Sequence, residues 1–336
     1  MTSVSVVILN YNGRQYLEKF LPTVIQHSQK HEIIIADNNS VDGSVEFLKT
    51  NFPNIRLITI NENYGFCGGY NRAIAQLNSD ICVILNSDIQ VTENWIEPII
   101  ELFEKDEKIA AIQPKLLDFN FRDKFEYAGG AGGFIDAYGY PFCRGRIFET
   151  IENDLGQYDD TREIFWASGA CMFIRTKLFK LYGGFDEDFF AHMEEIDLCW
   201  RMKKCGYKVF YCGESVVYHV GGGTLAYKNP RKTYLNFRNS ILVLIKNLSV
   251  LSLLWKLPFR WLVDYIAAIK FVLSGDMRDA MMILKAHMYV WRNFTKNFKK
   301  RKFIAKTREN RVGIFPKFLL FSYHIAGVRK FSDLKF

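Results

Sequence analysis

Short apolar runs alternate with amphipathic stretches through the first half of the chain. Four runs are rich in β-branched residues and have the length of strands; they span residues 3–10, 32–37, 55–60 and 80–86. The stretches between them, at residues 14–27, 42–52 and 68–78, carry apolar residues at helical spacing. This strand–helix–strand rhythm predicts an α/β fold built on a doubly wound, mostly parallel sheet.

The pattern changes along the second half of the chain. Residues 128–145 are rich in glycine and aromatic residues, and we predict a loop there. A strand is expected to begin at residue 170, a helix at 197–206, and two further strands at 208–212 and 215–220. Beyond about residue 230 strand signals stop and long helical patterns begin. We therefore predict two parts, an α/β domain at residues 1–228 and a helical region at residues 229–336.

Charge separates the same two parts. The chain has 44 Lys and Arg against 36 Asp and Glu, a net charge of +8. Residues 285–336 hold 14 of the basic residues and two of the acidic ones, a net charge of +12, so the remainder has a net charge of −4. A strongly basic end indicates an anionic partner, either lipid or nucleic acid.

The cysteines and the first residues indicate a cytoplasmic setting. Seven cysteines are scattered along the chain without a CxxC pair, which favours reduced thiols. No basic residue precedes the first apolar run, so we interpret that run as a strand and expect no secretory leader.

Candidate chemistry lies where the predicted strands end. All four end in Asn or Asp, at residues 10–12, 37–40, 61–64 and 86–88. Ligands of such sheets bind beyond the carboxyl ends of the strands. Asp37 suits a base N–H or a ribose hydroxyl, although Asp42 or Ser44 in the same motif also suits a helix cap. The glycines of NENYGFCGGYNRA suit a phosphate at a helix start, or an ordinary strand–helix turn.

Three further motifs carry acidic residues or histidine. Asp88 in VILNSDIQV is placed to bind Mg²⁺ or Mn²⁺, with Asn86 on the same side, unless both only form a turn. Glu194 and Glu195 stand at a predicted helix start, where they can supply a general base or only complement the helix dipole. Asp197 and Arg201, four residues apart, are expected to form a structural ion pair. His219 becomes a ligand only if the fold places it beside the metal-binding turn.

In order along the chain, these segments resemble the family 2 glycosyltransferases of the GT-A fold, notably the rhamnosyltransferase-like branch. The matching runs are VSVVILNYNG, IIIADNNSVDGS, ENYGFCGGYN, VILNSDIQV, WASGACMFIR, GGFDEDFFAHMEEIDLCWR and VVYHVGGGT, and they span about residues 3–224. The resemblance implies a Rossmann-like nucleotide half and an inverting transfer of sugar from a nucleoside diphosphate sugar to an acceptor hydroxyl.

The resemblance also implies roles by position. Asp37 looks like the residue that reads the nucleotide base. Asp88 looks like the last member of the metal-binding DxD motif, which reads Asn86-Ser87-Asp88 here, so weight falls on His219 as a second ligand of Mg²⁺ or Mn²⁺. The remaining substrate-binding positions are Asn10, Tyr11, Asn12 and Asn39 around the nucleotide, Gly65, Gly69 and Asn71 around nucleotide and sugar, and Trp166, Ser168 and Gly169 facing sugar and acceptor.

Glu195 matches the catalytic base of the family, which is usually an aspartate, and Glu194 is expected to contact the donor sugar or acceptor. Glutamate is one methylene longer and moves its carboxylate by roughly an ångström. Inversion in one displacement needs one base and no protein nucleophile, while a metal and helix N-termini stabilise the leaving diphosphate.

The helical region allows two interpretations. Charges interrupt the apolar run at residues 241–273, and its longest charge-free stretch, at 247–255, has nine residues, short of the ~20 that span a bilayer. Its basic residues, with Trp255 and Trp261, fit a helix lying in a membrane interface. The alternative is a helical hairpin packed on the catalytic domain or on a second subunit of a homodimer. Residues 291–310 interleave Lys and Arg with aromatic residues, which suits anionic lipid, and no nucleic-acid-binding motif is found.

The combined hypothesis is an inverting glycosyltransferase, peripheral on the cytoplasmic face of the cell membrane. Its donor would be dTDP-rhamnose or a UDP-sugar, and its acceptor a polyprenyl-linked or cell-surface glycan. One alternative is a sugar nucleotidyltransferase, although NYNGRQ, with one glycine, lacks the usual glycine-rich phosphate loop. The other is a non-catalytic membrane-associated scaffold, which the incomplete DxD motif favours and the Glu194-Glu195 pair opposes.

Overall fold

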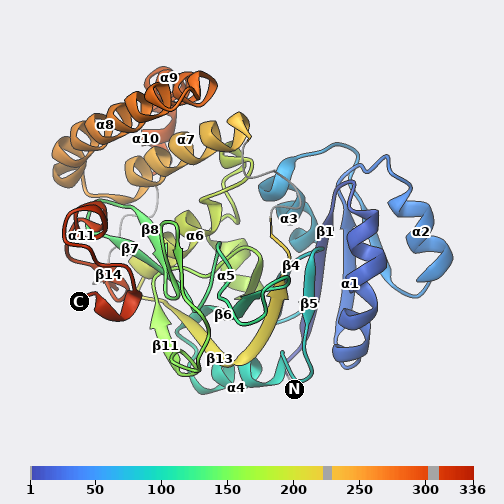
Figure 1. Cartoon of the computed structure of the whole chain (residues 1–336). Helices are drawn as coiled ribbons and strands as arrows, with labels where there is room; N and C mark the ends of the chain where they lie inside the picture. The colour runs from blue at the N-terminus through green and yellow to red at the C-terminus, as the bar shows by residue number, and fades with distance from the viewer. Residues whose placement is uncertain (1, 222–228, 302–309) are drawn as a thin grey trace.

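A mixed sheet forms the centre of the molecule in the computed structural model, which describes residues 2–221, 229–301 and 310–336 (Figure 1). Its strand order is β11-β13-β6-β12-β4-β1-β2-β3, and β5 pairs with β13. The bounds are β1 Val4–Asn10, β2 Glu32–Asp37, β3 Arg56–Thr59, β4 Ile81–Asn86, β5 Ile89–Val91, β6 Ile109–Asp118, β11 Thr161–Ile164, β12 Cys171–Arg175 and β13 Lys208–His219.

The N-terminal half is the parallel, doubly wound sheet that the sequence predicts. Strands β4, β1, β2 and β3 pair in parallel, which confirms all four predicted strands. Their connections are helices α1 (Arg14–His27), α2 (Ser44–Asn51) and α3 (Gly65–Ala75). Side chains alternate between two apolar layers: Val7 and Ile34 face the layer of α3, and Val6 and Ile35 face the layer of α1.

The other half of the sheet is mixed. Strand β12 lies antiparallel between β4 and β6, and β13 pairs in parallel with β6 and antiparallel with β11. Helices α4 (Glu97–Lys105), α5 (Thr176–Leu181) and α6 (Glu194–Lys204), with the short 3-10 helix η1 (Glu187–Phe189), connect these strands. The two strands predicted at residues 208–220 are one strand with a bulge between Cys212 and Val216.

A second, small sheet occupies the segment that the sequence predicts as a loop. Its order is β10-β9-β8-β7-β14, with bounds β7 Gly133–Asp136, β8 Pro141–Cys143, β9 Arg146–Ile147, β10 Thr150–Ile151 and β14 Ile314–Phe315. The loop prediction for residues 128–145 was therefore wrong for β7 and β8. Gly133 begins β7 because Trp166 covers it: a Cβ there would lie 2.1 Å from the indole ring. Strand β14 pairs with β7, so the expectation that strands stop beyond residue 230 was also wrong.

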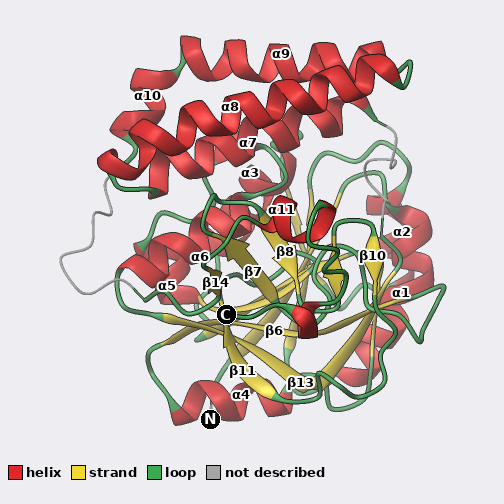
Figure 2. Cartoon of the chain, turned by 60° about the vertical axis from the view of Figure 1, so that its left-hand side comes forward, coloured by secondary structure: helices red, strands yellow, loops and turns green. Residues whose placement is uncertain are grey.

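The helices after residue 229 form a layer at one end of the molecule (Figures 1 and 2). They are α7 (Pro230–Asn247), α8 (Val250–Leu273), α9 (Met277–Arg292) and α10 (Phe294–Lys299), and the later α11 (Leu319–His324) lies beside the small sheet. Within the described residues, no helix combines the length and the apolar content that crossing a membrane requires. The division of the chain into parts at residues 228 and 229 stays a prediction, and residues 310–336 return to the α/β part through β14 and α11.

Candidate functional site

Two of the residues predicted to bind the nucleotide, Asn10 and Asp37, meet at the ends of β1 and β2. Asn10 pairs with Asp37 in the strand register, and its buried amide donates to Asp37 Oδ1 at 2.9 Å and to Ser40 Oγ at 3.0 Å. The Ser40 N–H donates to Asp37 Oδ2 at 2.9 Å. Both side chains are buried, so the structure holds the Asp37 carboxylate in a fixed position at the ligand edge of the sheet.

The neighbouring positions Tyr11, Asn12 and Asn39 are exposed. Tyr11 is 43% exposed, and Asn12 and Asn39 have positive φ, at 51° and 68°. The Asn12 side chain accepts from the Val41 N–H at 2.8 Å, which joins the two loops that follow β1 and β2. Asp42 does serve the helices: it accepts from the Arg14 N–H at 2.9 Å and the Ser44 N–H at 3.1 Å, at the starts of α1 and α2.

The start of helix α3 is shaped by close contacts. Gly65 has φ = 68°, and a Cβ there would lie 2.6 Å from the Phe190 ring, so this position requires glycine. A Cβ on Gly69 would lie 2.6 Å from the Leu9 side chain, so Gly69 lets α3 pack on β1. The Asn71 amide donates to the Phe185 carbonyl at 2.8 Å and accepts its N–H at 2.9 Å. Asn71 therefore holds the loop that precedes Glu194 and Glu195.

Asp88 and His219, 131 residues apart, meet beside the end of β4. Asp88 Oδ1 lies 3.1 Å from His219 Nε2, and Glu126 Oε1 lies 3.2 Å from His219 Nδ1. Burial opposes a charge on His219, but the two carboxylates outweigh burial and raise its pKa to about 10. Burial likewise disfavours the Asp88 anion, and the facing imidazolium reverses that effect and lowers the Asp88 pKa. Sequence reasoning missed Glu126, which no motif marks.

The donor set beside Asp88 fits a cation shared with a diphosphate. Asp88 offers one carboxylate, and His219 Nε2 offers one imidazole nitrogen once a cation displaces its proton; Asn86 Nδ2 lies 3.4 Å from the same nitrogen. Across the described ranges 2–221, 229–301 and 310–336, no group of three or more His, Cys, Asp or Glu is arranged to hold a metal. A cation here would need further oxygen ligands from a bound substrate.

Glu194 and Glu195 begin helix α6. Burial raises the pKa of Glu194 well above its ordinary value, and the neighbouring Glu195 raises it further. Burial also raises the pKa of Glu195, to about 7, against the backbone N–H groups of the first turn. Among described residues, Oε2 of neither carboxyl has a hydrogen-bond partner, although both atoms are buried. A buried carboxyl with a pKa near 7 suits a general base, because it can accept a proton at neutral pH.

The WASG segment lies beside this pair. A Cβ on Gly169 would lie 3.9 Å from Glu194 Oε1, which places Gly169 next to the carboxyl. Ser168 is buried, and its N–H donates to Gln113 Oε1 at 2.8 Å. Trp166 is buried too, and its indole N–H donates to the Phe134 carbonyl at 2.8 Å. Trp166 thus packs the small sheet, and the substrate contacts of all three stay predictions.

The segment before Glu194 is strained. Phe190, with φ = 65° and ψ = −56°, is the centre of a γ-turn in which the Ala191 N–H donates to the Phe189 carbonyl at 2.8 Å. His192 and Met193 also have positive φ, at 69° and 73°. Such conformations cost about 1–3 kcal/mol each and persist only when their surroundings hold them.

Helix α7 holds this strained segment. The buried Asn239 amide donates to the carbonyls of Phe189 at 3.0 Å and of Ala191 and His192 at 2.8 Å each. Arg238 donates to the Phe189 and Asp188 carbonyls, both at 2.8 Å. Sequence reasoning missed both residues, since their partners lie almost 50 positions earlier and neither stands in a recognisable motif.

Lys246 joins the same helix to α6. Its ammonium lies 2.7 Å from Asp186 Oδ2 and 2.7 Å from Asp197 Oδ2, and Arg201 pairs with Asp197 as predicted, at 2.9 Å. Arg260 and Asp264 of α8 are likewise buried and paired, at 2.7 Å. These charges in the apolar run therefore serve internal packing, not a membrane interface. The sequence did offer one signal for these pairs, because a charged residue within an apolar run indicates a buried partner of opposite charge.

Comparison with known proteins gives one family. The model of "Glycosyl transferase family 2" matches residues 5–183. An N-acetylglucosaminyl-diphospho-decaprenol L-rhamnosyltransferase of Mycobacterium tuberculosis is 26% identical over 277 residues, covering 78% of this chain and 89% of the relative.

Two solved structures share the fold. GalNAc-T7 with UDP, GalNAc and Mn²⁺ has a TM-score of 0.56 at 16% identity, covering 73% of this chain and 48% of that one. The mannosyltransferase PcManGT from Pyrobaculum calidifontis, in complex with GDP-Man and Mn²⁺, has a TM-score of 0.51 at 13% identity, covering 90% and 84%.

Proposed function

This chain belongs to glycosyl transferase family 2 and has the GT-A fold, and we propose that it is an inverting transferase that moves a sugar onto a lipid-linked or cell-surface glycan. The donor is a nucleoside diphosphate sugar. dTDP-rhamnose is the first candidate because the Mycobacterium tuberculosis relative is named a rhamnosyltransferase, and UDP-sugars are the second. The same relative's name supports a polyprenyl-diphosphate acceptor.

The observation that carries the proposal is Glu195 at the start of α6, with its pKa raised by burial to about 7. As base, its carboxylate takes the proton of the acceptor hydroxyl. The acceptor oxygen then bonds to the anomeric carbon from the face opposite the nucleotide, and the nucleoside diphosphate leaves with the electron pair. Glu194, beside Gly169, is placed to contact the sugar or the acceptor.

Replacing the base tests this assignment. We expect Glu195→Gln to lower turnover at least 10²-fold, because base catalysis contributes 10²–10⁴-fold, while calorimetric donor affinity changes little. Leu181→Glu, a change on the exposed side of α5 (62% exposed), is the matched control. Wild-type turnover by Glu195→Gln would remove Glu195 as base, and pyrophosphate release from a nucleoside triphosphate would instead favour a nucleotidyltransferase.

In this proposal, Asp37 and Asp88 lie at opposite ends of the bound nucleotide, Asp37 at its base and Asp88 at its diphosphate. The Asp37 carboxylate, held by Asn10 and Ser40, accepts hydrogen bonds from the nucleotide base. The exposed Tyr11, Asn12 and Asn39 surround the nucleotide. Asp88 and His219 would hold Mg²⁺ or Mn²⁺, which supplies positive charge to the leaving diphosphate. Two structural neighbours contain Mn²⁺, which supports a divalent cation as the cofactor.

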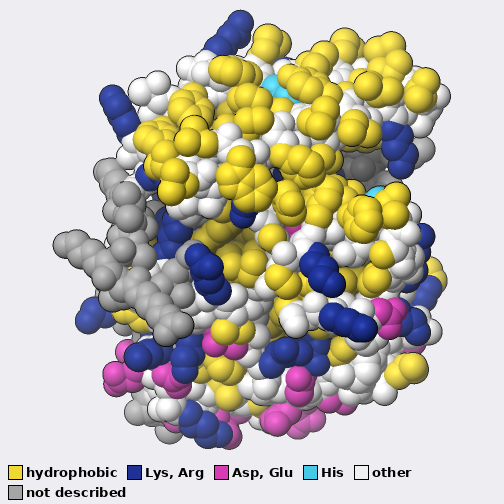
Figure 3. All heavy atoms as spheres, turned by 90° about the vertical axis from the view of Figure 1, so that its left-hand side faces the viewer, with side chains coloured by type: hydrophobic (Ala, Val, Ile, Leu, Met, Phe, Trp, Pro, Cys, Tyr) yellow, Lys and Arg dark blue, Asp and Glu magenta, His cyan; other side chains and the backbone are white. Residues whose placement is uncertain are grey.

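A cytoplasmic membrane surface is the proposed location. Large apolar side chains are exposed along both α8 and α9, and hydrophobic atoms gather over the upper part of the face in Figure 3, where the helical layer lies. On α9 they recur at helical spacing, at Met277, Met281, Leu284, Met288 and Trp291, each at least 49% exposed. Monomeric soluble proteins rarely expose so continuous a patch. Residues 250–301 contain ten Lys and Arg and three Asp. Without the buried Arg260–Asp264 pair, nine basic residues remain against two Asp, which favours an anionic bilayer over a second copy.

Vesicle flotation tests the location. We expect binding to vesicles containing anionic phosphatidylglycerol, weaker binding to neutral vesicles, and a loss of at least tenfold in Leu262→Glu/Leu284→Glu. Leu181→Glu again serves as control. A monomer that floats with neither vesicle would overturn the location, and a concentration-dependent dimer broken by the double variant would assign the face to a second copy.

A further inference from the structure

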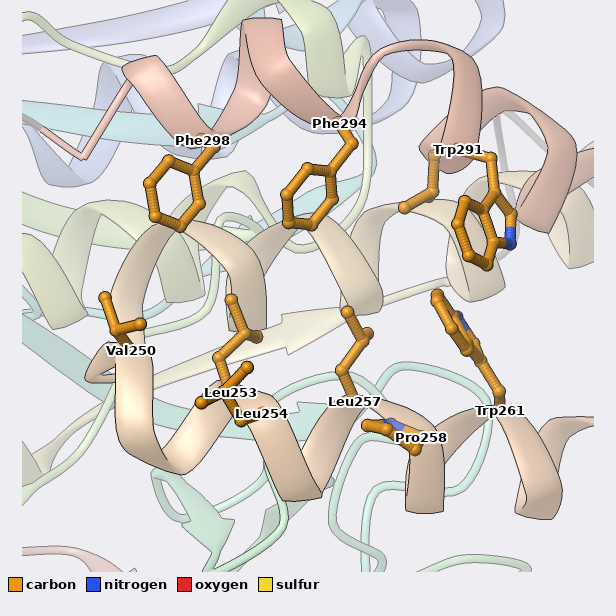
Figure 4. Close-up of a pocket in the computed structure, with 10 residues that line it drawn as sticks. Val250, Leu253, Leu254, Leu257, Pro258, Trp261, Trp291, Phe294 and Phe298 are labelled. Atoms are coloured by element: carbon orange, nitrogen blue, oxygen red, sulfur yellow. The ribbon is translucent and has the colours of Figure 1, made fainter.

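A groove lies between helix α8 and helices α9 and α10. Its walls include Leu253, Leu257 and Trp261 of α8, Trp291 of α9, and Phe294 and Phe298 of α10, which point toward one another across it (Figure 4). Its volume is about 490 Å³, and every residue that lines it is apolar. Protein interiors are close-packed, so a space of this size gives up contacts that an apolar ligand would restore.

The groove opens to the outside. Leu254 at its rim is 69% exposed, and Trp291 is 62% exposed. Trp291 also belongs to the exposed apolar stripe of α9, so groove and stripe are continuous. A hydrocarbon chain can therefore pass from a bilayer into the groove without crossing polar surface.

The walls and the charges nearby define the ligand. The ring centroids of the stacked Trp261 and Trp291 lie 4.8 Å apart, and those of Phe294 and Phe298 lie 5.7 Å apart, which gives flat apolar walls. The lining side chains carry no polar group besides the two indole N–H groups, too few to bind a sugar or peptide. Between residues 292 and 301 the chain has five Lys and Arg and no acidic residue. Lys296 and Lys300 pair with Asp188 and Asp186, and Arg301 donates to two backbone carbonyls, whereas Arg292 and Lys299 have no ion-pair partner among the described residues. An apolar groove beside a basic segment complements a ligand with a hydrocarbon chain and an anionic head.

The groove is connected to the base-bearing helix. Lys300, which follows Phe298 by two positions, lies 2.6 Å from Asp186 Oδ1. Lys246 contacts both Asp186 and Asp197, and Asp197 stands two residues after Glu195 on α6. Three ion pairs, Lys300–Asp186, Lys246–Asp186 and Lys246–Asp197, thus join the end of the groove-lining segment to helix α6.

We propose that the groove binds the isoprenoid chain of a polyprenyl-diphosphate acceptor and presents its head to Glu195. The inference rests on the proposed glycosyl transfer to a lipid-linked acceptor, and it adds the site that selects the lipid. The chain end nearest the diphosphate lies against the Trp and Phe side chains, and Arg292 and Lys299 attract the diphosphate.

The test compares two acceptors with the same glycan and diphosphate, one with a long isoprenoid chain and one with a methyl group, in detergent micelles without a bilayer. We expect wild-type protein to show a KM at least tenfold lower for the long chain. Leu254→Glu should lose this preference. Leu251→Glu, on the same helix and 78% exposed but outside the groove, should keep it. Equal preferences in the two variants would overturn the proposal.

A binding measurement separates this inference from the proposed function. Quenching of Trp fluorescence by polyprenyl phosphate should be saturable in wild-type protein and at least tenfold weaker in Leu254→Glu, even if no acceptor is glycosylated. Phosphatidylglycerol in the same micelles should quench weakly. Equal affinity for phosphatidylglycerol would assign the groove to bilayer lipid and overturn the isoprenoid assignment, whereas transfer without any chain preference would sustain the function and reject the groove.

Discussion

Removing the Asn239 side chain should release the segment that precedes Glu195, the proposed catalytic base. Its amide group has two hydrogens and serves three backbone carbonyls, those of Phe189, Ala191 and His192, at 2.8–3.0 Å. Asn239 is fully buried, so in Asn239→Ala water has little access to replace these bonds. The strained conformation of the segment then loses its main support from α7.

The size of the effect follows from these contacts. The Phe189 carbonyl keeps its Arg238 and Ala191 N–H donors, whereas the Ala191 and His192 carbonyls lose the Asn239 donor. Leaving buried carbonyls without a donor costs about 1–3 kcal/mol, and each bond contributes about 1 kcal/mol, so we expect a loss of unfolding free energy of about 2–4 kcal/mol. Relaxation of the strained γ-turn at Phe190 would recover part of the lost free energy of unfolding. The same relaxation would shift Glu195 out of its active position. A deficit of 2–3 kcal/mol in the active conformation lowers turnover roughly 30- to 150-fold, at 1.4 kcal/mol per factor of ten.

Urea unfolding and turnover at saturating donor measure the two effects separately. Asn297→Ala removes another buried amide, which donates to the Asn293 carbonyl within α10, and should lower stability without a comparable loss of turnover. Asn239→Asp keeps the shape and loses the donors, so it should be at least as impaired as Asn239→Ala. If Asn239→Ala retained turnover within twofold of wild type, helix α7 would not position the base.

Other expectations follow from the same structure. Turnover should rise about tenfold per pH unit below pH 7 and level off above it, as Glu195 loses its proton; a flat profile over pH 5–8 would contradict its role. Because burial raises the pKa of Glu194, the folded state retains a proton that the unfolded state releases, so stability should fall as pH rises above about 4.5; Glu194→Gln should lessen this slope in urea titrations. Calorimetry should show that Asp88→Ala abolishes the Mn²⁺-dependent part of donor affinity, and identical affinities with and without EDTA in wild type would exclude it. Gly69→Ala should cost about 1–3 kcal/mol through its clash with Leu9, seen as a melting point lower by a few degrees.

Local sequence signals predicted the parts of the fold that depend on local periodicity. The β-branched runs became β1 to β4, and the Asn and Asp residues at their ends meet because parallel strands bring their carboxyl ends to one edge. Asp197 and Arg201 pair as predicted because helix geometry fixes positions four apart. The resemblance to family 2 glycosyltransferases, which rests on seven ordered motifs, supplied the fold and the family that the comparisons show.

Long-range partners were not predictable. The resemblance to family 2 glycosyltransferases placed His219 beside Asp88, but nothing in the sequence indicates Glu126 on the other side of the imidazole. Nothing near Asn239 indicates three carbonyls almost 50 residues earlier. The segment at residues 128–145 has the glycine content of a loop, but its strands exist because Trp166 and residues 314–315 lie against them. Contacts between residues far apart in the sequence determine these features, and local composition does not indicate such contacts.

The pairing of β14 with β7 makes the helical layer an insertion, not an appendage. Ile314 and Phe315 complete a sheet begun some 180 residues earlier. The rings of Phe331 and Phe336 pack at steep angles against Phe134 of β7, with centroid distances of 4.7 and 5.5 Å. A chain cut at residue 229 would therefore leave β7 as a bare edge beside uncovered aromatic rings, a surface prone to self-association. For expression, domain exchange or directed evolution, the catalytic part should be handled with its C-terminal segment attached.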